Sequence, residues 1–198
     1  AYIGGATAQA THAMNEWWGK KGIGTMPHAL IQLFDGDVVE ACKAYYKKFP
    51  EDELVALVDY NNDVITDSLK VAREFGSELK GVRLDTSRTL IDKHFLRNQH
   101  LLGTFDPRGV NAELVFALRE ALDKEGFQHV KIVVSGGFTK QRIEEFEKNN
   151  VPVDMYGIGS SLLKINIGFT GDNVILNGKP QAKEGRRYRP NPRLEKVE

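Results

Sequence analysis

The stretch VKIVVSGGFTKQRIEEFEK, residues 130–148, decides the fold class. Its first five residues include four β-branched apolar side chains, which is typical of a buried parallel strand. Ser135, Gly136 and Gly137 then indicate a turn, and Thr139 is a good N-cap for a helix that runs to Lys148. A strand followed at once by a helix is the repeating unit of α/β proteins.

The same alternation continues on both sides of this stretch. Pro50, Gly76 and Gly126 are natural helix stops. The polar stretch 86–108 has no clear periodicity. The expected strands cover residues 23–25, 54–58, 80–84, 130–134 and 153–156, and the expected helices cover 6–18, 36–48, 63–75, 111–124 and 139–148.

Successive strand–helix units imply parallel strands joined by right-handed crossovers. Five such strands fit part of a (β/α) barrel or an open doubly wound sheet. We favour an α/β fold in which residues 1–170 form an incomplete (β/α) barrel. Residues 171–198 differ: Asn177-Gly178 predicts a β-hairpin with a type I′ turn, and a basic tail follows it. We expect this hairpin to belong to a second, mostly absent domain.

Composition excludes several classes of function. Lys+Arg and Asp+Glu both number 27 among 198 residues, so the chain lacks the basic excess of a broad nucleic-acid-binding surface. No apolar run is long enough to span a membrane and no signal peptide is visible, so we expect no membrane partner and a cytoplasmic location. The single cysteine, Cys42, lies on an apolar helix face and is expected to be a buried core thiol. The chain starts without Met, and we expect it to be the middle of a longer protein.

Polar and glycine residues follow each expected strand. Functional groups of α/β folds gather at the carboxyl ends of the strands. Strands chosen for packing alone would not need this set at five successive ends. The set comprises Thr25 and His28, then Asp59, then Arg83 and Asp85, then Ser135, Gly136 and Gly137, then Gly157, Gly159 and Ser160.

The two glycine turns suit a phosphate group. Glycine lets the backbone approach closely and turn its N–H groups inward, and a helix that starts just afterwards adds its positive end. Two such turns in succession match the usual phosphate site of (β/α) barrels. The alternative is that Gly136-Gly137 and Gly157/Gly159 only permit tight turns, and for one motif alone we would prefer it.

His28 is a candidate catalytic residue. A lone histidine is more often structural, but this one follows a strand and lies near Thr25. A neutral imidazole attacks phosphoryl groups or moves a proton, and Asp59 would hold its tautomer. No spacing among the histidines and Cys42 indicates a zinc site.

Arg83 and Asp85 lie two residues apart on one strand, so they share a face. Val82 and Leu84 take the opposite face and would pack on the helices. An inward Arg83 would clamp an anion, and Asp85 would bind ribose hydroxyls or Mg²⁺. If the pair pointed outward, it would be a solvated ion pair of little consequence.

These motifs occur in the order found in nicotinate phosphoribosyltransferases, and the chain resembles that family over nearly its whole length. The ending from Asn177 through Arg193 also looks like the C-terminus of that family. The motifs that carry the resemblance are GTMPH (24–28), VRLD (82–85), VSGGF (134–138) and VPVDMYGIGSSL (151–162).

The resemblance implies a barrel of the type II phosphoribosyltransferase kind, usually dimeric, with a further α/β domain. It implies nicotinate, phosphoribosyl pyrophosphate and ATP as substrates, and Mg²⁺ as cofactor. By this resemblance ATP phosphorylates His28, Arg83 binds the nicotinate carboxylate or a phosphate, Asp85 binds ribose and Mg²⁺, and the glycine turns hold the 5′-phosphate. We expect a homodimer or an assembly with an N-terminal part.

The chain departs from the family in one loop. Many relatives have Ser-Gly-Asp where this chain has Thr86-Ser87-Arg88, which leaves the ribose contacts of this loop open. A quinolinate or nicotinamide phosphoribosyltransferase, another phosphate-binding barrel enzyme and a non-catalytic phosphate-binding fragment remain alternatives. The basic stretch 185–189 is a solvated tail or a phosphate contact.

Overall fold

Four parallel strands form the sheet of the larger part of the chain. The computed structural model describes residues 2–164, 166–168 and 171–195. The expected domain boundary at residue 170 therefore lies outside the described residues. The chain divides into two units, one that extends to Leu162 and one that starts at Leu163. The strands of the first unit are β1 (Leu54–Leu57), β2 (Leu79–Leu84), β3 (Lys131–Val134) and β4 (Met155–Tyr156).

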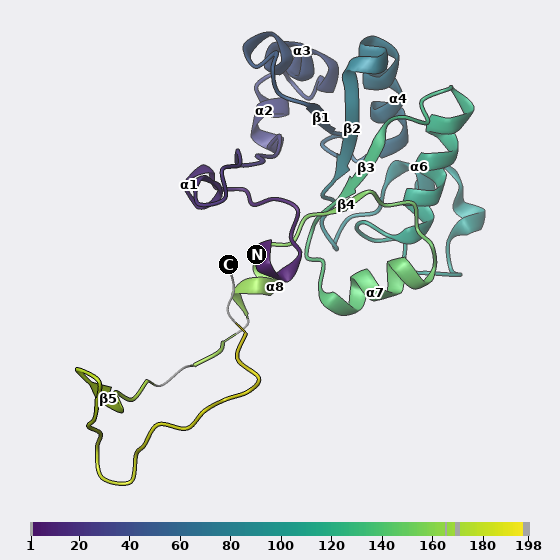
Figure 1. Ribbon diagram of the computed structural model, residues 1–198. Helices are drawn as coiled ribbons and strands as arrows, with labels where there is room; N and C mark the ends of the chain where they lie inside the picture. The colour runs from purple at the N-terminus through teal and green to yellow at the C-terminus, as the bar shows by residue number, and fades with distance from the viewer. Residues whose placement is uncertain (1, 165, 169–170, 196–198) are drawn as a thin grey trace. The chain divides into compact units, whose positions relative to one another are not determined.

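The strand order distinguishes a barrel from a doubly wound sheet. The strands pair as β1-β2-β3-β4, in chain order and all parallel. Right-handed crossovers without a reversal of strand order place every connecting helix on one face. The sheet does not close among the described residues, so the prediction of an incomplete (β/α) barrel is confirmed. The helices beside it are α3 (Val38–Lys48), α4 (Val64–Phe75), α6 (Ala112–Lys124) and α7 (Lys140–Lys148) (Figure 1).

The core lies between the sheet and these helices. Ala56, Val82 and Ile132 are in register on neighbouring strands, and none of them is exposed. Leu118 of α6 is equally buried. Cys42 of α3 belongs to the same core, as predicted, and burial followed by the charge of Asp37 raises the pKa of its thiol to about 12.

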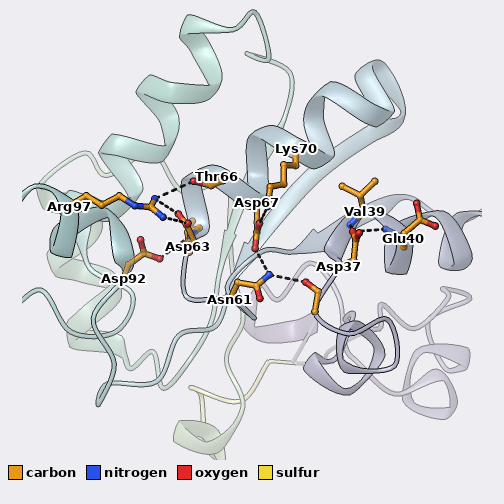
Figure 2. Close-up of polar contacts among 12 residues, drawn as sticks. Asp37, Val39, Glu40, Asn61, Asp63, Thr66, Asp67, Lys70, Asp92 and Arg97 are labelled. Carbon is orange, nitrogen blue, oxygen red and sulfur yellow. Dashed lines mark hydrogen bonds and ion pairs between the residues drawn. The ribbon is translucent and has the colours of Figure 1, made fainter.

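A polar network holds the loop that follows β1 (Figure 2). The Asn61 side chain donates hydrogen bonds to the Gly36 carbonyl at 2.8 Å and to Asp67 at 2.9 Å. Arg97 binds both oxygens of Asp63, the residue just before α4, with a distance of 2.9 Å between Nη1 and Oδ1. Paired and hydrogen-bonded carboxylates of this kind tolerate burial. The network therefore fixes the backbone that carries the carboxyl end of β1.

The stretch that showed no periodicity contains only short elements. Helix α5 (Lys93–Arg97) and the 3₁₀ turn η3 (Gln99–Leu101) follow β2, and a single antiparallel bridge joins Ile91 to Arg108. Asp92 is fully buried and accepts hydrogen bonds from the backbone N–H groups of Val64 and His94. One carboxylate thus caps both α4 and α5.

Two predictions for the N-terminal segment are wrong. Residues 23–25 form no strand; the backbone N–H of Ile23 donates to the Gln9 carbonyl instead, and none of the described strands pairs with this segment. The helix expected over residues 6–18 is reduced to α1 (His12–Glu16), after a 3₁₀ turn η1 (Tyr2–Gly4). Asn15 is the only buried residue of α1, so the helix has no apolar face against the core to extend it.

The second unit contains the predicted hairpin in shorter form. Strands β5 (Ile175–Leu176) and β6 (Lys179–Pro180) pair antiparallel. Asn177 and Gly178 both have positive φ, at 50° and 75°, as a type I′ turn requires. Among the described residues, no helix has the length and apolar character needed to cross a membrane.

Candidate active site

Arg83 is a nearly buried cation near the carboxyl end of β2, an inner strand of the sheet. It lies in register with Leu57 and Val133, on the face opposite to Val82. Its side chain donates to Ser135 Oγ at 2.9 Å and to the Met26 carbonyl at 2.6 Å. A guanidinium has five N–H donors, so these contacts leave donors for a ligand.

Asp85 completes the surroundings of Arg83. One Asp85 oxygen lies 3.1 Å from the Arg83 guanidinium, and the other accepts a hydrogen bond from Ser135 Oγ at 2.7 Å. The Ser135 hydroxyl also lies 3.2 Å from the Leu84 carbonyl, but its single proton favours the shorter contact with the charged acceptor. The Asp85 side chain keeps 30% of its surface exposed, so it can still contact a ligand.

Asp59 joins this group from the end of β1. One of its oxygens accepts hydrogen bonds from the Asp85 backbone N–H at 3.1 Å and from the Thr86 hydroxyl at 3.0 Å. The side chain is 1% exposed. Burial raises the pKa of Asp59, and the neighbouring His28, Thr86 and Asp85 N–H oppose that rise. The carboxyl therefore releases its proton at a higher pH than an exposed aspartate does.

His28 faces the other Asp59 oxygen. It is the first residue of α2 (His28–Gln32), and its ring is about half exposed, at 45%. Nε2 lies 3.2 Å from Asp59 Oδ1, but its N–H is not aimed well enough for a hydrogen bond, and Oδ1 has no donor among the described residues. The contact becomes an ion pair only when the His28 ring is protonated. It directs Nε2 to Asp59 and leaves Nδ1 without a protein partner in the described chain.

The first glycine turn follows β3. Gly136 and Gly137 both have φ in the left-handed region, at 90° and 75°, where other residues are strained. Gly157, which starts the second turn, packs closely against Ser135: a Cβ at residue 157 would lie 3.0 Å from the Ser135 Cβ. The ends of β3 and β4 are therefore in direct contact.

Some predicted site residues stay outside this network. Thr25 is exposed and makes no side-chain hydrogen bond in the described structure. A Cβ added at Gly159 would meet nothing within 4 Å. Ser160 is exposed at the start of α8 (Ser160–Leu163). The neighbouring Ser161, which sequence reasoning missed, donates instead to the Phe138 carbonyl at 2.9 Å.

Two further residues were missed. The Met26 carbonyl contacts Arg83 through the backbone, which side-chain types do not report. Thr86 directly follows Asp85, and its position just past a strand end was a usable signal. Among the described residues, no three His, Cys, Asp or Glu side chains gather as a metal site.

The comparisons with known proteins point to one family. No model of a known protein family matches the chain. Over 167 residues it is 27% identical to the nicotinate phosphoribosyltransferase of Mycobacterium tuberculosis, found in two strains. The match covers 82% of this chain. The crystal structure of nicotinate-nucleotide pyrophosphorylase from Pyrococcus furiosus superimposes with a TM-score of 0.66 at 32% identity, over 94% of this chain.

The chain is a relative of the nicotinate phosphoribosyltransferases.

The chain spans less than half the length of the relatives that it matches. The matched region is 31% of the curated mycobacterial protein and 43% of the Pyrococcus chain. The human nicotinic acid phosphoribosyltransferase superimposes with a TM-score of 0.52 at 18% identity, over 79% of this chain and 38% of the human one. At that identity the likeness shows a common fold, which agrees with the incomplete barrel.

Proposed function

We propose that this chain carries the phosphoribosyl-transfer site of a nicotinate phosphoribosyltransferase. The proposed reaction joins nicotinate to phosphoribosyl pyrophosphate, forming nicotinate mononucleotide and pyrophosphate. One observation supports it above the others: His28, Asp59, Arg83, Asp85 and Ser135 form a continuous chain of contacts at three strand ends. The names of the relatives supply the substrate class.

Each group of this chain of contacts has a role in the proposed reaction. The pyridine nitrogen attacks the anomeric carbon of the ribose, pyrophosphate leaves, and positive charge develops on the sugar. The negative charge of the Asp85 carboxylate stabilises that cation, and its oxygens accept hydrogen bonds from the ribose hydroxyls. The free donors of Arg83 bind the nicotinate carboxylate or a phosphate, and the Gly136-Gly137 turn binds the 5′-phosphate.

We propose that Asp85 would help to hold Mg²⁺ bound to the diphosphate of phosphoribosyl pyrophosphate. When bound, it neutralises charge on the leaving group. Mg²⁺ is commonly held by one or two carboxylates together with substrate phosphates, so a single partly exposed Asp85 fits this role. Both Asp85 oxygens already have partners, Ser135 and Arg83, which makes Asp85 a weak site without substrate.

His28 is the proposed site of phosphorylation by ATP. In the neutral ring, the Asp59 carboxylate beside Nε2 favours the tautomer with its proton on Nε2, which leaves the lone pair of Nδ1 for attack on the γ-phosphoryl group. The bond that forms is Nδ1–P, and ADP takes the electron pair of the broken P–O bond. Hydrolysis of the phosphohistidine would then draw the transfer reaction forward.

The test measures substrates and products directly. The chain, and in parallel the complete open reading frame that contains it, is incubated with phosphoribosyl pyrophosphate, MgATP and either nicotinate, nicotinamide or quinolinate. We expect nicotinate mononucleotide, ADP and an acid-labile phosphohistidine that His28→Asn abolishes. Product from quinolinate without ADP would establish the sibling activity instead. Binding of phosphoribosyl pyrophosphate without product in either protein would favour a non-catalytic phosphate-binding role.

The assembly is part of the proposal. Relatives are much longer, so we propose that the active unit is a homodimer or includes further N-terminal sequence. Sedimentation of the chain alone and of the complete open reading frame measures this. A monomer that is fully active by itself would contradict it.

A further inference from the structure

Two arginines from different loops reach the same glycine turn. Arg88, in the loop after β2, donates from Nη2 to the Gly137 carbonyl at 3.0 Å. Arg142, in the first turn of α7, donates from Nη1 to the Gly136 carbonyl at 3.2 Å. Two successive carbonyl groups of one turn are thus each bound by a guanidinium.

The Arg142 side chain and the Arg88 backbone are each packed against neighbouring residues. The Arg142 guanidinium lies over the Phe138 ring, with 4.2 Å from Cζ to the ring centroid, and also binds the Val110 carbonyl. The Arg88 backbone packs against Gly109, where an added Cβ would lie 3.1 Å from the Arg88 Cα. These contacts fix the Arg142 side chain and the backbone from which the Arg88 side chain extends.

The two cations lack close carboxylate partners. Neither Arg88 nor Arg142 forms a salt bridge among the described residues. Burial first, and then the charge of Arg88, lower the pKa of Arg142, while Glu145 offsets part of that effect. An anion at the turn would relieve the repulsion between the two guanidinium groups.

Peptide geometry relates these contacts to the N–H groups of the turn. The chain has no cis peptides among the described residues, so each carbonyl and the following N–H point in opposite directions. A Gly136 carbonyl bound by Arg142 directs the Gly137 N–H away from Arg142. A Gly137 carbonyl bound by Arg88 does the same for the Phe138 N–H. Neither N–H has an acceptor in the described part of the chain.

We propose that Arg88 and Arg142 are positioning residues that hold the Gly136-Gly137 turn with its Gly137 and Phe138 N–H groups directed at a phosphoryl group. The inference rests on the proposed function, in which this turn binds the 5′-phosphate. It assigns a role to Arg88, which lies in the loop where this chain has Thr86-Ser87-Arg88. The two side chains act through the backbone, on the side of the turn opposite to the ligand.

A neighbouring hollow is a poorer place for the anion. It measures about 760 Å³ and is lined by Arg88, Arg142 and Arg108. Asp106, Glu113 and Glu145 line it as well, so its formal charge is zero. Arg108 is already paired with Asp106 at 2.8 Å. The unpartnered N–H groups of the turn are the stronger anion ligands.

The test observes the backbone itself. Inorganic phosphate is titrated into the ¹⁵N-labelled full chain while the amide resonances of Gly137 and Phe138 are followed by NMR. Affinities for phosphoribosyl pyrophosphate and for nicotinate are measured separately by calorimetry. For Arg88→Met we expect about tenfold weaker binding of phosphoribosyl pyrophosphate, from one impaired charge-assisted hydrogen bond, and unchanged nicotinate affinity. Arg142→Lys keeps the charge but loses the planar guanidinium with its several N–H donors. For this variant too we expect weaker binding of phosphoribosyl pyrophosphate and unchanged nicotinate affinity.

Arg108→Met is the matched control. It removes the same charge from the lining of the same hollow without touching the turn. We expect its affinity for phosphoribosyl pyrophosphate to stay within about twofold, since exposed charges are screened by solvent and salt. Equal weakening by Arg88→Met and Arg108→Met, or phosphate shifts at Asn111 and Thr139 in place of Gly137 and Phe138, would overturn the proposal.

The outcomes separate this inference from the proposed function. Phosphate shifts at the turn that depend on Arg88 and Arg142, in a protein that does not respond to phosphoribosyl pyrophosphate or nicotinate, would refute only the function. Binding of phosphoribosyl pyrophosphate that is insensitive to both arginines would refute only their positioning role. Absence of binding by both phosphate and phosphoribosyl pyrophosphate would refute the two together.

Discussion

The helix-covered face of the sheet and its carboxyl-end edge are built from different kinds of interaction. The helix-covered face, with Ala56, Val82 and Ile132, is apolar and fully buried, and its free energy comes from area removed from water. The carboxyl-end edge holds Arg83 and Asp59, two charged groups that are almost as buried. Buried ion pairs contribute little net stability because desolvation offsets their attraction. The helix-covered face therefore supplies most of the stability, whereas the charged edge is where the proposed function places ligand binding.

The largest expected effect is on the helix-covered face. Leu118→Ala should lower the free energy of unfolding by about 2–5 kcal/mol, since it removes a fully buried side chain and leaves a cavity. Phe116→Ala on the same helix, where the ring is 44% exposed, should cost much less. Denaturant unfolding measures both. The distinction between the helix-covered face and the carboxyl-end edge fails if Leu118→Ala instead changes the ligand affinity of the folded protein with little loss of stability.

The next effect is at the edge. Arg83→Met should weaken binding of phosphoribosyl pyrophosphate or nicotinate by about 10–100-fold, the loss of a charge-assisted hydrogen bond, with a smaller change in stability than Leu118→Ala. Calorimetry and urea unfolding of the same samples measure the two quantities. Arg73→Met, which removes an exposed arginine paired with Glu125, is the control and should leave both unchanged. A large stability loss without a binding loss would assign Arg83 to the fold.

A smaller effect is expected where the two regions meet. Gly157→Ala places a Cβ 3.0 Å from the Ser135 Cβ, so the ends of β3 and β4 must separate by a few tenths of an ångström. Overpacking of this kind should cost about 1 kcal/mol and also weaken ligand binding, because Ser135 contacts Arg83. Gly159→Ala meets nothing within 4 Å and should be silent. Thermal unfolding and calorimetry of the pair test this, and equal effects would remove the distinction.

The smallest effect is a pH dependence at Asp59. Burial raises the pKa of Asp59 in the folded protein. The contribution of its protonated carboxyl to folding stability is therefore complete below the ordinary aspartate pKa of 3.8, and it is lost as pH rises through the folded pKa. The stability of Asp59→Asn relative to the wild type should therefore increase with pH over that window. Phosphorylation of His28 should also rise with pH over that window, since only the ionised carboxylate orients the ring. Urea unfolding at a series of pH values would show a flat difference if burial does not perturb Asp59.

Much of the fold followed from local patterns. The strands around Val82 and Ile132 and the helix over 111–124 were predictable because apolar periodicity and burial coincide there. Residues 23–25 were misassigned because an isolated β-branched pattern does not say whether a partner strand exists. The structure of the segment after β2 could not be predicted, because it is fixed by contacts with residues distant in the sequence. One example is Asp92, which caps both α4 and α5.

The candidate site was predictable only in part. Side chains at strand ends were found because parallel strands place their carboxyl ends together. Arg88 and Arg142 were missed because their partners are carbonyl groups, which every residue carries. Thr25, Gly159 and Ser160 were included from motif position alone, and the structure gives them no contact with the network.

The backbone and the side chain of Asp85 contact residues that follow two different strands. Its main-chain N–H orients the acid at the end of β1, while its carboxylate serves Arg83 and Ser135. Replacing Asp85 by asparagine would change only the side-chain contacts, because asparagine has the same backbone N–H. Asp85→Asn would thus test the charge at the proposed ribose site while the hydrogen bond from the residue 85 backbone N–H to Asp59 is kept.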